Sequence, residues 1–312
     1  MKSVILESYG DVDAFKKVEE QMPEPKENEV LLEVAATSLN AIDWKIRAGK
    51  LKDMLDLKLP IIMGWDVSGV VKKAGDKVST FKPGDEVYGR AKLFKPGGFT
   101  EYMVIEENLL IAKPENLSFE EAAAIPLTGT TAWTSLSDEA NLKKGEQVLI
   151  HGGSGGIGSF AVQFAKYFGA TVAATASGKN EDYVRSLGAD LFIDYKKEDF
   201  SNRVDAFDVV LDTQGGEVQE NSFKVLKHSG RLVSLISEPD EDQAKSKNIA
   251  ATYLNNSKPS LEQMKKIGKL MSEGVIKPPH IEVFPFTLEG VRNAHQAGES
   301  GRTKGKLVVK VR

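Results

Sequence analysis

The stretch EQVLIHGGSGGIG, residues 146–158, decides the fold together with SFAVQFAKYFG, residues 159–169. Gln147–Ile150 is a short apolar run typical of a buried strand, a glycine-rich turn follows, and apolar residues then recur at helical spacing over Ile157–Phe168. Strand, glycine turn and helix in this order suit a phosphate-binding loop. Glycine permits positive φ without a side chain in the way, and a helix start offers free amides and a positive dipole end to an anion. A plain strand-to-helix turn is the alternative.

The segments after this stretch continue the alternation. Strands are expected at 171–176, 191–194 and 207–212, and a helix at 179–187. Such a series of βαβ units predicts an α/β fold with a doubly wound parallel sheet, in which the glycine turn binds the pyrophosphate of a dinucleotide.

The end of the second strand of this series bears on which dinucleotide is bound. An NAD site usually carries an acid about 20 residues after the glycines, to accept from the ribose hydroxyls. Residues 174–180 read ATASGKN and contain no acid. Ser177 and Lys179 instead offer a hydroxyl and an ammonium to a phosphate, which favours NADPH. Asn180 is a further cofactor-binding candidate. Alternatively, Lys179 is a solvated loop charge.

Composition excludes several classes of protein. The 312 residues suffice for two domains with their own cores. Lys and Arg number 41 against 45 Asp and Glu, which argues against a nucleic-acid or anionic-membrane partner. The absence of cysteine excludes disulfides, a thiol nucleophile and cysteine-ligated metals, and fits a cytosolic protein. Met1–Glu7 is too short for a signal h-region, and no apolar run reaches the ~18 residues of a membrane span.

The segments before and after the glycine stretch are expected to contain different kinds of secondary structure. Residues 1 to about 125 are predicted to form a small β-barrel with a short helix at 40–49. Glu238–Lys247 is expected to be an exposed loop, and with residues 253–259 to shape the substrate end. The remaining expected elements are strands at 4–6, 30–34, 67–71, 86–88, 99–105, 231–236, 251–254, 283–286 and 306–311, helices at 261–273 and 288–297, and two helices broken at Pro126.

Blocks spread over the whole chain carry a family resemblance. They are NAIDWKIRAG (40–49), GWDVSGVV (64–71), FKPGDEVYG (81–89), GGFTEYMVI (97–105), AAIPLTGTTAW (123–133), HGGSGGIG (151–158), FDVVLDTQGG (207–216) and GKLVVKV (305–311). In these the chain resembles the zinc-free quinone oxidoreductases, the zeta-crystallin-like branch of the medium-chain dehydrogenase/reductase superfamily.

The resemblance implies a GroES-like β-barrel catalytic domain over 1–124, a Rossmann NADPH-binding domain over 125–255 and a return to the catalytic domain over 256–312. It implies a cytoplasmic homodimer or tetramer that reduces quinones, or the C=C bond of enones and enals. Zinc-dependent relatives bind their metal through a cysteine and a His-Glu pair. Here Asp43 stands in the first region and Gly-Trp-Asp at 64–66 in the second, which indicates a zinc-free member.

The resemblance also implies roles for single residues. The cofactor contacts are Ser154, Gly155, Gly156 and Ile157 at the pyrophosphate, Thr130 facing the cofactor, Ser177, Lys179 and Tyr195 at the 2′-phosphate, and Lys306 near the C-terminus. Asn40 and Lys45 are the catalytic candidates; Lys45 stands near where many members carry a tyrosine and is also a cofactor contact in one subgroup. It is predicted to donate to the substrate carbonyl and stabilise the enolate.

Each role has a structural alternative. Thr130 would only cap a helix, Tyr195 would cover a strand end, and Lys45 and Lys306 would be solvated charges. None of the four histidines shows metal-ligand spacing, and His151 is interpreted as a packing or backbone-bonding residue. The predicted reaction is direct hydride transfer from NADPH to a quinone or to the β-carbon of an unsaturated carbonyl, without metal. The rival functions are a non-catalytic NADPH-binding sensor or structural protein, and a zinc-type alcohol dehydrogenase.

Overall fold

The chain forms two compact units. The computed structural model describes residues 1–203, 206–254 and 260–312. The described residues of unit 1 are 1–127, 260–273 and 278–312, and those of unit 2 are 128–203, 206–254 and 274–277. The domain boundaries expected at 124/125 and 255/256 stay predictions, and the second lies outside the described residues.

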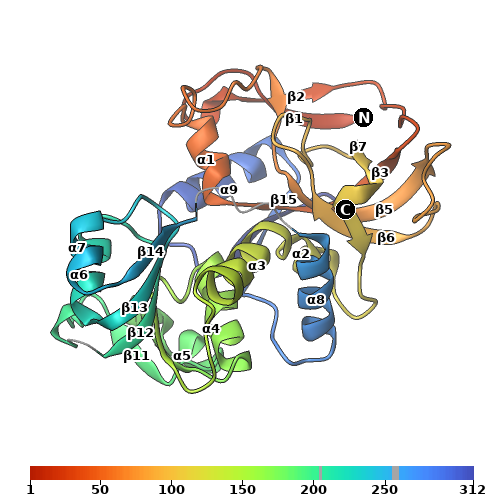
Figure 1. The fold of residues 1–312 in the computed structure, drawn as a ribbon. Helices are drawn as coiled ribbons and strands as arrows, with labels where there is room; N and C mark the ends of the chain where they lie inside the picture. The colour runs from red at the N-terminus through yellow and green to blue at the C-terminus, as the bar shows by residue number, and fades with distance from the viewer. Residues whose placement is uncertain (204–205, 255–259) are drawn as a thin grey trace. The chain divides into compact units, whose positions relative to one another are not determined.

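Unit 2 is built on a six-stranded parallel sheet with the strand order β11-β10-β9-β12-β13-β14. Figure 1 shows α4 and α5 on one side of this sheet and α6 and α7 on the other. The strands are β9 Gln147–Ile150, β10 Thr171–Ala176, β11 Leu191–Asp194, β12 Phe207–Asp212, β13 Leu226–Ser234 and β14 Ala250–Tyr253. The helices are α4 Gly156–Tyr167, α5 Glu181–Ser186, α6 Glu217–Val225 and α7 Glu241–Ser246. Strand order reverses between β9 and β12, and parallel sheets bind nucleotides at such a switch point.

The apolar runs of the sequence explain this sheet. A strand covered by helices on both faces reads as a continuous apolar segment, and the middle residues of β9, β10 and β12 are fully buried. The strands expected at 171–176, 191–194 and 207–212 are confirmed residue for residue.

The loop expected over Glu238–Lys247 is wrong, because most of it is α7. Asp240 caps this helix by accepting a hydrogen bond from the Gln243 amide, and the Lys245 ammonium lies 2.9 Å from Glu241 one turn earlier. A short helix held by a cap and a charge pair shows little apolar periodicity, which is why the pattern missed it. The other segment predicted to shape the substrate end is 253–259, and its residues 255–259 lie outside the described residues.

Unit 1 contains a seven-stranded sheet and a three-stranded one. In the larger sheet the order is β15-β16-β3-β5-β6-β8, with β7 also paired to β3; in the smaller it is β2-β1-β4. The strands are β1 Lys2–Leu6, β2 Phe15–Glu19, β3 Glu29–Leu39, β4 Ile61–Ile62, β5 Asp66–Ala74, β6 Glu86–Arg90, β7 Tyr102–Glu106, β8 Leu110–Ala112, β15 Ile281–Pro285 and β16 Lys306–Lys310. The helices are α1 Ala41–Arg47, α2 Phe119–Ala123, α8 Leu261–Ser272 and α9 Leu288–Glu299, and α3 Pro126–Trp133 crosses the unit boundary.

The C-terminal segment completes the sheet of unit 1. β16 pairs antiparallel with β3, so that Leu307 lies opposite Leu39. α9 packs beside α1, as Figure 1 shows, and its buried Val291 and Ala294 join the core of this unit. This pairing brings residues near position 40 next to residues near position 306. Among the described residues, no helix has the length and apolar character needed to cross a membrane.

Candidate functional site

The glycine turn of unit 2 follows β9 and leads into α4. Gly152 has a φ of +68°, which favours glycine. A Cβ on Gly158 would come within 2.1 Å of the Gly152 carbonyl oxygen, so α4 can approach the turn only without a side chain there. A Cβ on Gly155 would meet only one atom within 4 Å, at 3.4 Å. Gly155 is the N-cap of α4 and its helix start receives no side-chain cap, which leaves open space in front of a helix N-terminus.

His151 anchors this turn and is neutral. Its Nε2 lies 3.1 Å from Ser222 Oγ, whose own proton goes to the Val218 carbonyl, so Nε2–H is the donor of that pair. Nδ1 therefore accepts from Thr175 Oγ1 at 3.1 Å. Burial lowers the pKa of His151 to about 4, against the opposing charge of Asp212. The ring thus links β9, β10 and α6. It is buried, as expected of a packing residue, but the hydrogen bonds of its two nitrogens go to side-chain hydroxyls and not to the backbone.

The residues predicted at the adenosine end follow β10 and β11. Ser177 begins the short turn Gly178–Asn180, Lys179 is exposed, and Tyr195 is 58% exposed directly after β11. Asn180 is buried and donates from Nδ2 to Ser154 Oγ at 3.0 Å. This bond ties the predicted pyrophosphate turn to the predicted 2′-phosphate turn, so the structure brings the two groups of residues together at one edge of the sheet.

In unit 1 a buried polar network surrounds Asn40, at the junction of β3 and α1. Lys306 on β16 donates from Nζ to Asn40 Oδ1 at 2.6 Å and to the Leu39 carbonyl at 2.8 Å. Asn40 Nδ2 donates to Asp66 Oδ2 at 2.9 Å. A lysine ammonium can only donate hydrogen bonds and a carboxylate can only accept them. The Asn40 amide must therefore turn its oxygen to Lys306 and its nitrogen to Asp66, which fixes its orientation.

Two acids and two cations balance in this network. Arg90 lies 2.5 Å from Asp66 Oδ1, and Asp43 Oδ2 accepts from the Asn40 backbone amide at 2.6 Å. Burial raises the pKa of Asp43 to about 6, and its Oδ1 is buried without a hydrogen-bond partner. Burial likewise lowers the pKa of Lys306 to about 8, although Asp66 and Asp43 oppose the shift. At pH 7 the lysine is charged and compensates the acids.

Two further predicted site residues, Lys45 and Thr130, lie on the helices α1 and α3. Lys45 is half-buried on α1, with its ammonium 5.9 Å from the ring centroid of Trp44. Thr130 is buried in α3 and belongs to unit 2. The predicted residues thus form two groups: Asn40, Lys45 and Lys306 in unit 1, and the predicted cofactor residues from 130 to 195 in unit 2.

Arg90 was missed by the sequence interpretation. Asp66 and Arg90 are opposite each other in the antiparallel β5–β6 pair. The sequence did offer a signal, because β5 begins with Asp66 and β6 ends with Arg90. That signal becomes informative only when the register of the two strands is known.

The described residues contain no group of three or more histidine, aspartate or glutamate side chains that could hold a metal ion. Asp43 and Asp66, the two acids that the family resemblance sets against the zinc ligands of metal-dependent relatives, are engaged with Asn40, Arg90 and the α3 backbone.

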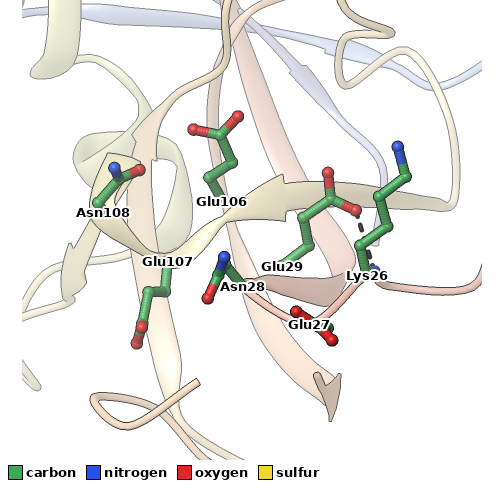
Figure 2. Close-up of a pocket in the computed structure, with 7 residues that line it drawn as sticks. All are labelled: Lys26, Glu27, Asn28, Glu29, Glu106, Glu107 and Asn108. Atoms are coloured by element: carbon green, nitrogen blue, oxygen red, sulfur yellow. Dashed lines mark hydrogen bonds between the residues drawn. The ribbon is translucent and has the colours of Figure 1, made fainter. Parts of the chain in front are cut away.

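An open depression of about 730 Å³ lies in unit 1, and Figure 2 shows the side chains around it. Its lining residues are Lys26, Glu27, Asn28, Glu29, Glu106, Glu107 and Asn108. Glu106 pairs with Lys92, and Glu107 accepts from the Ser79 and Thr80 amides. β3 runs from Glu29 to Leu39, a length of about 33 Å, so the depression lies at the opposite end of β3 from Asn40. It is therefore separate from the candidate site.

Comparison with known proteins agrees with this architecture. A family model described as alcohol dehydrogenase GroES-like domain matches residues 26–115, and one described as zinc-binding dehydrogenase matches residues 187–309. The chain is 40% identical to 2-methylene-furan-3-one reductase of Solanum lycopersicum and 37% identical to the chloroplastic NADPH-dependent alkenal/one oxidoreductase of Arabidopsis thaliana. Each alignment covers 99% of this chain and 79% of the relative. The solved quinone oxidoreductase of Coxiella burnetii superposes with a TM-score of 0.90 at 36% identity, over 100% of this chain and 99% of that one.

The chain belongs to the quinone oxidoreductase branch of the medium-chain dehydrogenase/reductase superfamily. The predicted fold class is thereby confirmed: a GroES-like unit and a Rossmann unit. As a member of this superfamily the protein is an oxidoreductase that uses a nicotinamide cofactor. The glycine turn fits such a cofactor, because the space at Gly155 in front of α4 is what a pyrophosphate requires.

Proposed function

We propose that this protein uses NADPH to reduce quinones or the C=C bond of α,β-unsaturated carbonyl compounds, by hydride transfer that requires no metal. The observation that carries the proposal is the open, uncapped start of α4 at the switch point of a Rossmann sheet, in a chain similar over its whole length to reductases of these compounds. The names of those relatives supply the substrate classes.

The preference for NADPH rests on the turn after β10. Ser177 and Lys179 provide a hydroxyl and an exposed ammonium, and Tyr195 stands exposed beside them after β11. Asn180 holds this turn to Ser154. These groups are suited to a phosphate on the adenosine ribose.

When bound, NADPH supplies the hydride. The proposed role of Lys45 is to donate a hydrogen bond to the substrate oxygen on which negative charge develops. Asn40 offers the second proton of its Nδ2, because the first is used by Asp66 and its oxygen is used by Lys306. In this assignment Lys306 and Asp66 keep the Asn40 amide in one orientation, so that no rotation is needed when the reactants arrive.

The remaining cofactor contacts are proposed to be Thr130, Ser154, Gly155, Gly156 and Ile157.

We also propose that the protein is a homodimer in the cytoplasm, as the family resemblance implies. Sedimentation of the purified protein tests the oligomeric state, and localisation of a tagged copy tests the compartment.

The test is the loss of NADPH absorbance on mixing with 1,4-naphthoquinone and with a series of enones and enals, in the presence of a chelator. We expect turnover with at least one acceptor class and no effect of the chelator. Binding of NADPH without turnover of any acceptor contradicts the catalytic proposal and favours a binding protein.

A pair of lysine variants separates catalysis from binding. Lys45 and Lys50 both lie over the Trp44 ring, at 5.9 and 4.7 Å from its centroid, but Lys50 has no proposed role. We expect Lys45→Ala to lower kcat by about tenfold or more and Lys50→Ala to leave it nearly unchanged. A Lys45→Ala variant that alters only NADPH affinity contradicts its catalytic role.

A further inference from the structure

Asp194 lies beside the turn proposed to bind the 2′-phosphate. It is the last residue of β11 and stands opposite Ala176, the last residue of β10, in the parallel pair. The Tyr195 amide then donates to the Ala176 carbonyl at 3.3 Å. The register therefore puts an acid next to Ser177, although residues 177–180 contain no acid of their own.

Gly178 shows how close this acid comes. A Cβ on Gly178 would lie 2.4 Å from Asp194 Oδ2 and 3.2 Å from its Cγ. Gly178 is not among the residues with positive φ, so the need for glycine here comes from the carboxylate and not from the backbone conformation. The Asp194 carboxylate thus lies directly against the turn that contains Ser177 and Lys179.

The carboxylate is only partly compensated by its surroundings. Its side chain is 11% exposed, and Oδ1 accepts from the Lys196 amide at 3.1 Å. The ammonium of Lys197, 80% exposed, lies 3.9 Å from Oδ2. A carboxylate can only accept hydrogen bonds, and water screens its charge poorly when it is mostly buried. It therefore repels a nearby phosphate and tolerates a ribose hydroxyl.

We infer that Asp194 is a specificity-determining residue for the cofactor, one that limits the preference for NADPH over NADH. Ser177 and Lys179 attract the 2′-phosphate, and Asp194 opposes it from the neighbouring strand. The protein therefore binds NADH at a measurable affinity as well as NADPH. The inference rests on the proposed function, since it requires that unit 2 bind the dinucleotide at this turn.

The test is the ratio of the dissociation constants of NADH and NADPH, measured by quenching of protein fluorescence without substrate. Asp194→Asn keeps the shape of the side chain and an oxygen for the Lys196 amide but removes the charge. We expect the ratio to move about fivefold in favour of NADPH, mainly through tighter NADPH binding. Asp194→Ser, which removes the charge by a smaller side chain, should move the ratio in the same direction if the asparagine variant folds poorly.

The matched control is Glu198→Gln. Glu198 lies on the same segment after β11, but its carboxylate faces Arg203 at 3.6 Å, and the substitution changes the net charge equally. We expect it to leave the ratio unchanged. Equal weakening of both cofactors by Asp194→Asn, or an unchanged ratio in both Asp194 variants, overturns the inference. If the unaltered protein binds neither cofactor, the proposed function itself fails, which is a separate result.

Discussion

At the scale of single residues, the Asn40 amide holds a lysine and a carboxylate together inside unit 1. Its oxygen accepts a hydrogen bond from Lys306, and its nitrogen donates one to Asp66. The side chains of Asn40 and Lys306 meet across 266 positions of the chain, because β16 returns to pair with β3. No local pattern encodes that pairing, whereas the short helix after β3 was predictable from residues 40–49 alone.

The charge balance of this network leads to a prediction for Lys306→Met. Removal of the ammonium leaves Asp43 and Asp66 with Arg90 as their only cation in the network described above, so we expect a loss of about 3–5 kcal/mol in the free energy of unfolding. Adding Asp43→Asn should recover part of this loss, because it removes one uncompensated acid. Urea unfolding at pH 7 measures both.

The control for this prediction is Lys310→Met. Lys310 is on the same strand, but it is exposed and pairs with Glu120 at 2.9 Å. Its loss should cost about 1 kcal/mol or less. Similar costs for the two lysines would contradict a buried charge network at Lys306.

At the scale of elements, apolar runs predicted the parallel strands of unit 2 well, because strands buried on both faces have a simple signature. The glycine stretch identified the turn and the helix for a different reason, which is that a side chain at Gly158 would clash with the turn backbone. α7 was missed because the Asp240 cap and the Lys245–Glu241 pair, which help to hold it, produce no periodic signal. The contact between Asp194 and Gly178 was missed because it depends on the register of β10 against β11, which the sequence of neither strand reveals.

Two glycines at the start of α4, its N-cap Gly155 and Gly158 within its first turn, should respond differently to alanine. At Gly155 the added methyl group meets only one atom, at 3.4 Å, and the residue has a φ of −81°, so the fold should lose less than about 1 kcal/mol while dinucleotide binding falls strongly. At Gly158 the methyl group would come within 2.1 Å of a backbone oxygen, so we expect a loss of about 2–4 kcal/mol and of binding.

Thermal unfolding and NADPH titration of the two variants check this pair. The informative case is Gly155→Ala, because it separates folding from binding. If it binds NADPH as the unaltered protein does, the space in front of α4 is not where the pyrophosphate lies.

At the scale of the whole molecule, stability should fall in acid. Burial lowers the pKa of His151 to about 4 and of His295 to about 3, from 6.5. Between those values the unfolded chain binds more protons, so both contributions are lost as pH falls below 6.5. Asp43, whose pKa is raised to about 6 from 3.8, acts in the opposite direction between pH 6 and 3.8. From these three groups we expect a net loss of about 3 kcal/mol between pH 7 and pH 4.5.

His295→Phe provides the measurement that assigns this loss. His295 is fully buried beside Phe15 and Phe99, at 4.6 and 5.8 Å between ring centroids, and neither of its ring nitrogens has a hydrogen-bond partner. Phenylalanine keeps a ring there and cannot be protonated. Urea unfolding at pH 7 and pH 4.5 should show a much smaller difference for this variant, and an unchanged difference would mean that His295 does not titrate as described.

The return of β16 to β3 also has a consequence for the order of events during synthesis. β3, α1 and β5 leave the ribosome long before residues 306–310 are synthesised. Asp43 and Asp66 therefore have no Lys306 to compensate their charges at that stage. Unit 2 is largely continuous in the chain and is synthesised before Lys306. We therefore expect the Rossmann unit of the nascent protein to be complete before unit 1 is. A polypeptide that ends just before Lys306 would lack β16, the C-terminal strand that pairs with β3, although it contains all the strands of the Rossmann sheet.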